Sequence, residues 1–129
     1  MNERKEMPMR TQIRRVRFLT DVLLQYEKTD GAWASEKRLY ESMPFLVNVM
    51  LPGGKEKAIC GCVEYAPANG SDLQTARQEV IGHGRRYAGR HIDTADLREL
   101  PSMVYSSFAG RKARMGYAGP LNGGHFGSY

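Results

Sequence analysis

The sequence predicts an α+β fold in which a small antiparallel sheet of about three strands is covered by two main helices. Residues 11–28 have the apolar spacing of an amphipathic helix, and residues 45–65 contain two β-rich runs around a Pro-Gly-Gly turn. A second amphipathic stretch follows Asn69-Gly70. Placing the helices on one face of an antiparallel sheet buries all of these apolar surfaces together.

The length of 129 residues and the mass of 14.5 kDa correspond to one domain with its own core. We divide the chain into a flexible N-terminal arm at 1–10, one α+β domain at 11–108 and a C-terminal arm at 109–129. No run approaches the roughly 18 apolar residues of a membrane span, and the first residues lack the apolar segment of a signal peptide. We therefore expect a cytoplasmic protein with no membrane partner.

The first predicted helix begins at Thr11, a suitable N-cap, and ends before Asp30-Gly31. Its apolar positions share one side of a helical wheel, namely Ile13, Val16, Leu19, Val22, Leu23 and Tyr26. The alternative is a strand over residues 22–26 that turns at 29–31. We favour the helix. A short polar helix is expected at 35–42, ended by Pro44.

Residues 45–65 predict a β-hairpin. The apolar run 45–51 and the run 58–65 are strands, and Pro52-Gly53-Gly54-Lys55 between them has the composition of a turn. Because side chains two residues apart in a strand share a face, Cys60 and Cys62 are expected side by side.

The second main helix is predicted from Ser71, which has capping-box spacing to Gln74. Its apolar stripe contains Leu73, Ala76, Val80, His83 and Tyr87. Gly82 and Gly84 weaken the last turn, so we expect the helix to end near Ile81 or to fray there. Residues 103–108, which follow Pro101, predict a third strand.

Residue types that carry catalysis or bind metals are few. The candidates are Cys60, Cys62, His83, His91 and His125. Cys-Gly-Cys has one spacer too few for a zinc knuckle, and the histidines follow no ligand spacing. No nucleophile elbow, phosphate-binding loop or zinc-protease helix is present. We therefore predict a non-enzymatic protein with no catalytic residues, no metal site and no cofactor.

The basic residues suggest a binding function. The net charge is +5 and the pI is near 9.4, with six Lys and Arg against two Glu in residues 1–20. Arginine binds phosphate bidentately, and neighbouring aromatic rings can stack on unpaired bases. A solvated protein surface is the alternative explanation of the same residues. The predicted contacts with nucleic acid or a nucleoprotein assembly are Arg14, Arg15, Arg17, Arg85, Arg86, Arg111, Lys112 and Arg114.

The C-terminal arm gives a second hypothesis. Residues 109–129 hold six of the fourteen glycines and no carboxylate. Spaced apolar side chains on a Gly-rich backbone suit docking on a neighbouring subunit, as in a structural or oligomerising protein. The alternative is a disordered terminus without a role. Small size, basic charge and absent motifs are also typical of phage and mobile-element accessory proteins. The predicted docking residues are Tyr117, Leu121, Phe126 and Tyr129.

Overall fold

The long strand β3, Lys37–Met50, is the centre of this computed structural model, which describes residues 9–29 and 36–120. The other elements, in chain order, are β1 (Arg10–Phe18), a 3-10 turn (Thr20–Val22), β2 (Leu24–Thr29), β4 (Glu56–Pro67), α1 (Leu73–Arg85), β5 (His91–Asp93), a 3-10 segment (Thr94–Glu99), α2 (Leu100–Ser106) and β6 (Ala113–Pro120).

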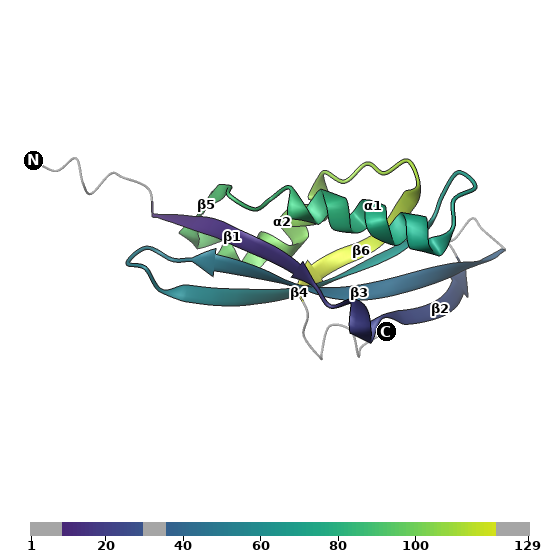
Figure 1. Cartoon of the computed structure of the whole chain (residues 1–129), viewed down its shortest axis with the longest axis horizontal. Helices are drawn as coiled ribbons and strands as arrows, with labels where there is room; N and C mark the ends of the chain where they lie inside the picture. Colours follow the sequence, from purple (N-terminus) through teal and green to yellow (C-terminus); the bar gives the residue numbers. More distant parts are fainter. Residues whose placement is uncertain (1–8, 30–35, 121–129) are drawn as a thin grey trace, which may run out of the picture.

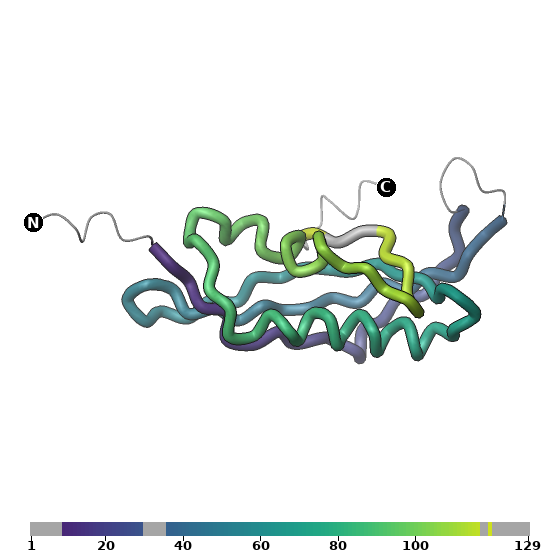
Figure 2. The backbone as a smooth tube through the Cα atoms, turned by 90° about the horizontal axis from the view of Figure 1, so that it is seen from above, coloured from purple at the N-terminus to yellow at the C-terminus, as the bar shows by residue number. Residues whose placement is uncertain are grey.

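These strands form one antiparallel sheet. Its order is β5-β1-β3-β4-β6, and β2 also pairs with β3. Both α-helices lie on the same face of the sheet (Figure 1), and α1 runs along the length of the sheet with α2 beside it (Figure 2). The prediction of about three strands covered by two helices is wrong, because the described residues form six strands in one sheet.

The helix predicted for residues 11–28 is also wrong, because this segment forms β1, the 3-10 turn and β2. The register of β1 shifts between Ile13 and Arg15, which inserts one residue into the alternation of the strand. Ile13 and Val16 therefore face the same side although they are three residues apart, as in a helix. The bulge gave the strand a helical apolar spacing.

β1 and β2 lie one after the other along the same side of β3. Phe18 pairs with Phe45, whereas Leu24 pairs with Ser42, so the chain leaves the sheet between them. The Leu19 N–H donates to the Pro44 carbonyl at 2.9 Å at this point. Pro44 has no N–H, so little pairing is lost where the chain departs.

Two shorter predictions are corrected as well. The polar helix expected at 35–42 is wrong for its described part, because 37–42 begins β3, which continues through Pro44. The strand expected at 103–108 is wrong, because 100–106 is α2. Its buried residues have helical spacing, and Pro101 stands in the first turn, where a missing N–H costs nothing. These residues are Leu100, Pro101, Val104 and Tyr105.

The predicted pairing within 45–65 is present, since β3 and β4 pair antiparallel from Glu41–Tyr65 to Met50–Glu56. A helix also follows Asn69-Gly70, with two differences from the prediction. Its N-cap is Asp72, whose side chain accepts a 2.8 Å hydrogen bond from the Thr75 N–H. The helix continues to Arg85. Its last turn does not fray, because Gly84 packs against Phe18 and Tyr105.

The core lies between the sheet and the two helices. Alternate residues of β3 point into it, and side chains from both helices meet them. Fully burying one large apolar side chain contributes about 1.5–3 kcal/mol, so this layer is the main source of stability. Its buried members from the sheet include Ile13, Phe45, Val47, Val63 and Tyr65, and those from the helices include Ala76, Val80, Val104 and Tyr105.

Glu41 is a fully buried carboxylate within this layer. It accepts two hydrogen bonds from Arg77 of α1, from Nε at 2.7 Å and from Nη2 at 2.9 Å. Gln25 of β2 donates to it at 2.8 Å, and the Tyr65 hydroxyl of β4 also donates to it. Burial raises the pKa of Glu41, but these hydrogen bonds and the charge of Arg77 outweigh it, so the pKa is lowered.

Two glycines of α1 provide a matched pair of stability tests. We expect Gly84→Ala to destabilise the fold by about 1–3 kcal/mol, because the new methyl would lie 2.5 Å from Cζ of Phe18 and 2.8 Å from the hydroxyl of Tyr105. The new methyl of Gly82→Ala would have no neighbouring heavy atom within 4 Å, so this variant should be more stable than the wild type by about 0.5–1 kcal/mol. Urea unfolding of both variants measures the difference. Equal effects would show that α1 does not pack closely at Gly84.

Glu41 should make stability depend on acid. The folded-state pKa of Glu41 lies below the ordinary value of 4.5. The carboxylate therefore contributes to the free energy of unfolding above pH 4.5, and this contribution is lost as the pH falls through the folded-state pKa. Glu41→Gln should lower the free energy of unfolding by about 3 kcal/mol at pH 7. The variant should also lose less stability than the wild type between about pH 5 and pH 3. Urea titrations across this range provide the measurement, and parallel pH profiles would contradict the assignment.

Candidate functional site

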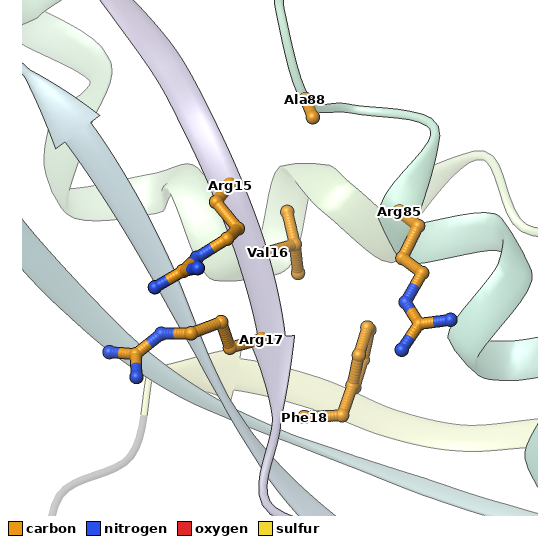
Figure 3. A pocket seen from close by; sticks show the side chains of 6 residues that line it. All are labelled: Arg15, Val16, Arg17, Phe18, Arg85 and Ala88. Carbon is orange, nitrogen blue, oxygen red and sulfur yellow. The ribbon is translucent and has the colours of Figure 1, made fainter.

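A cationic hollow lies at the edge of the sheet, between β1 and the end of α1. Its volume is about 450 Å³. Figure 3 shows Arg15 and Arg17 pointing to one side of β1, with Phe18 and Arg85 on the other side. We call this hollow the arginine groove, and its lining residues are Arg15, Val16, Arg17, Phe18, Arg85 and Ala88.

The alternation of β1 after its bulge sets one side of the arginine groove. Val16 and Phe18 pair with Val47 and Phe45, so they face the helices. Arg15 and Arg17 pair with Asn48 and Leu46 and face the opposite side of the sheet. The groove therefore extends around the outer side of β1, with Phe18 and Arg85 on the side of α1 and with Arg15 and Arg17 on the opposite side (Figure 3).

Contacts between α1 and β1 set the position of Arg85. The ring of Phe18 lies so close to Gly84 that no side chain would fit there, which brings the last turn of α1 down onto β1. Two hydrogen bonds then fix the loop after the helix. The Gly89 N–H donates to the Ile13 carbonyl at 2.7 Å, and the Ile13 N–H donates to the Arg90 carbonyl at 2.8 Å. The walls of the groove are therefore held by the fold itself.

The arginines here have few protein partners. Arg17 Nε donates to the Asn48 side-chain oxygen at 2.9 Å. Within residues 9–29 and 36–120, the recorded ion pairs join Lys28 to Glu64 and Arg77 to Glu41, and none involves Arg15 or Arg85. A second hollow of about 260 Å³ adjoins the groove through the shared Arg15, and is lined by Arg14, Arg15, Asn48 and Glu56. This end of the molecule therefore carries several available guanidinium groups.

The structure brings together two of the three predicted basic clusters. Arg15, Arg17 and Arg85 all line the groove, the first two on one side of β1 and Arg85 on the other (Figure 3). Arg14 lies in the second hollow, and Arg86 caps α1 as an exposed residue. A helix C-terminus favours cations, which accounts for Arg85 and Arg86 on structural grounds alone. This explanation does not extend to the arginines of β1.

The third cluster, Arg111, Lys112 and Arg114, lies at the opposite edge of the sheet. Glu79 of α1 accepts hydrogen bonds from the N–H groups of Arg111 at 2.9 Å and Lys112 at 2.7 Å. Arg114 is in β6 opposite Ala66 of β4. Since β6 and β1 are separated by β3 and β4, this cluster does not contribute to the arginine groove.

Part of the predicted C-terminal arm is a strand, because Ala113–Pro120 forms β6 and pairs with β4. Ala113 and Met115 pack on the core, and this alternation is the signal that the Gly-rich composition obscured. Among the predicted docking residues, the Tyr117 backbone lies opposite Glu64, and its side chain is outside the described part. Leu121, Phe126 and Tyr129 also lie outside the described residues.

The cysteines and histidines have structural surroundings. Cys60 is exposed and Cys62 is buried, and both are free thiols. Burial and the nearby Glu64 charge raise the pKa of Cys62 to about 11. His83 Nε2 lies 2.7 Å from the Val104 carbonyl, and His91 pairs with Gln12. In the described residues no three His, Cys, Asp or Glu side chains are arranged to hold a metal ion, and His125 lies beyond them.

A polar cluster on the sheet face away from the helices was missed, because its β2 members were assigned to a helix. Glu64 is 8% exposed and pairs with Lys28 Nζ at 2.7 Å. The Tyr26 hydroxyl donates to Glu64 and lies 2.8 Å from Ser42 Oγ. Burial, then the hydrogen bond to Glu64, raises the pKa of Tyr26, which keeps its phenol protonated. The polar groups of this cluster form hydrogen bonds and an ion pair with one another, so the cluster serves to hold β2 on the sheet.

Comparison with known proteins does not name a relative. The chain matches no protein-family model, no curated protein and no solved structure. Among the described residues, neither helix is long and apolar enough to cross a membrane. The arginine groove, with its hollow shape and its three cations, is the feature of the described residues that indicates a function.

The two thiols should differ sharply in reactivity. We expect iodoacetamide at pH 8 to modify Cys60 rapidly in the folded protein and Cys62 only after unfolding in urea, because Cys62 is buried and its thiolate is disfavoured. Peptide mass spectrometry identifies the modified residue, and Cys60→Ser provides the control without the exposed thiol. Equal labelling of both residues in the folded state would contradict this view of the β4 face.

Proposed function

We propose that this protein is a non-enzymatic, cytoplasmic nucleic-acid-binding protein whose primary contact is the arginine groove. The observation that carries the proposal is that Arg15, Arg17 and Arg85 line one hollow, although they come from β1 and α1, far apart in the sequence. Arg15 and Arg17 lie on one side of β1 and Arg85 lies on the other (Figure 3). Charged side chains that serve solubility alone do not have to gather around one hollow.

The chemistry of guanidinium groups supports phosphate as the recognised group. Each guanidinium presents its N–H donors as a planar fork that matches two phosphate oxygens. Among the described residues, neither Arg15 nor Arg85 forms an ion pair with a carboxylate, so no such pair has to break before they bind phosphate. The net charge of +5 adds a long-range attraction for a polyanion. A free nucleic acid or one within a nucleoprotein assembly presents the same phosphates.

The first functional test compares the groove with the other basic edge. We expect labelled oligonucleotides to bind in fluorescence polarisation at about 50 mM salt and to lose roughly twentyfold to two-hundredfold in affinity at about 200 mM, as about three or four phosphate contacts require. The double variant Arg15→Ala/Arg85→Ala should bind more weakly and with a shallower salt dependence, by about one unit of slope for each arginine.

The matched control is Arg111→Ala/Lys112→Ala, which removes the same charge from the opposite edge of the sheet. If both double variants lose equal affinity, net charge and not the groove determines binding. Absence of binding at low salt would refute the proposal and favour an acidic protein surface as the partner of these arginines.

A further inference from the structure

We propose that the arginine groove selects single-stranded nucleic acid, by stacking one unpaired base on Phe18 while the arginines hold the adjacent phosphates. This inference rests on the proposed function and goes beyond it, because phosphate binding alone does not distinguish single strands from duplexes. Three features of the groove favour an unpaired base: its apolar part, the fixed position of Phe18 and its open side.

The groove is apolar between its cationic sides. Phe18 and Ala88 contribute apolar surface, whereas Val16, which also lines the groove, is buried in the core. Figure 3 shows Arg85 on the Phe18 side of β1, with Arg15 and Arg17 across the strand. A phosphate backbone needs cations and gains nothing from apolar surface. An unpaired base has both requirements, since its ring stacks on an aromatic side chain and its flanking phosphates pair with cations.

The ring of Phe18 is held in place before any ligand binds. It packs on Phe45 with 5.8 Å between ring centroids, and it lies directly against the backbone of Gly84. Phe18 is nevertheless only half-buried, and it is one of the residues that line the groove. A fixed ring loses little conformational freedom on binding, which favours its use as a stacking surface.

The groove is also open and large enough for a nucleotide. Its volume of about 450 Å³ falls within the range of small-molecule sites, roughly 300–1,000 Å³. Among the described strands, β5 covers only Arg10, Thr11 and Gln12 of β1, so no described strand lies outside residues 14–18. A ligand can therefore approach this part of β1 from solvent.

The second hollow indicates the path of the bound nucleic-acid strand. Since Arg15 lines both hollows, a strand crossing the outer edge of β1 would place one nucleotide in each, with Arg15 at the intervening phosphate. Asn48 and Glu56 in the second hollow offer oxygen acceptors for the amino group of a base and not for a phosphate. Bases of an intact duplex are stacked and paired, so they would have to flip out to reach either hollow.

The test uses the unmodified protein with one oligonucleotide sequence, presented as a single strand and as a blunt duplex at the same salt concentration. We expect the single strand to bind at least about tenfold more tightly, because one or more stacked bases contribute on this scale. Equal affinity would overturn single-strand selection and leave the proposed function intact. Absence of binding to both forms would instead refute the proposed function.

Phe18→Leu tests the stacking residue itself. Leucine keeps an apolar side chain against Phe45 and Gly84 but lacks a π face, so single-strand affinity should fall about fivefold or more, with the salt dependence unchanged. Phe18→Tyr keeps the ring and should bind like the wild type. The control is Phe108→Leu, which removes a half-buried ring packed on His83 and Tyr105, outside the groove.

Thermal unfolding checks that the three variants are folded. If Phe18→Leu binds single strands as well as Phe108→Leu does, Phe18 is not the stacking surface and the inference is overturned. If Phe18→Leu does not fold, the affinities of the unmodified protein for the single strand and for the duplex still decide whether it selects single strands.

Discussion

Strand β3 constrains the rest of the structure, because it carries partners along both of its sides. On one side it pairs with β1 and β2 in succession, and on the other side it pairs with β4 over ten residue pairs. Two buried carboxylates secure the end of the sheet where β2 pairs. Glu41 binds Arg77 on the helical side, and Glu64 of β4 binds Lys28 on the opposite face. A buried charge is tolerated only when it is paired, so each carboxylate fixes the element that supplies its partner.

The same contacts determine the geometry of the arginine groove. Helix α1 is attached to the sheet at two points: Arg77 binds Glu41 near its start, and Gly84 packs on Phe18 near its end. A rigid helix held at two points has little freedom to rotate or slide, so Arg85 has a defined position beside β1. The groove thus depends on core packing, which fixes the backbone positions of its arginines before a ligand binds. Fixed backbone positions reduce the entropy lost on association.

Sequence patterns identified elements whose apolar spacing was regular. The 45–65 hairpin was readable because two apolar runs flank a Pro-Gly-Gly turn, and α1 was readable from its stripe. Residues 11–28 were misread because the bulge after Ile13 imitates helical spacing. Val104 and Tyr105 favour strands but pack as part of a helix because tertiary contacts outweigh propensity. The arginine clusters were visible as residues, but their position around one hollow depends on long-range pairing that local patterns do not encode.

Arginines on the part of β1 that β5 leaves uncovered have a simpler explanation, because charge on an exposed sheet edge prevents association with other sheets. That role explains why cations stand on the outer part of β1, but it requires neither a hollow nor an aromatic ring beside them. Phe18 could have been fully covered by a longer loop after α1, and instead it remains half-buried between cations from two elements. A partly exposed Phe18 adds apolar surface to a sheet edge at which charged side chains oppose association with other sheets. The combination is explained when the ring and the cations bind one ligand that has both an aromatic and an anionic part.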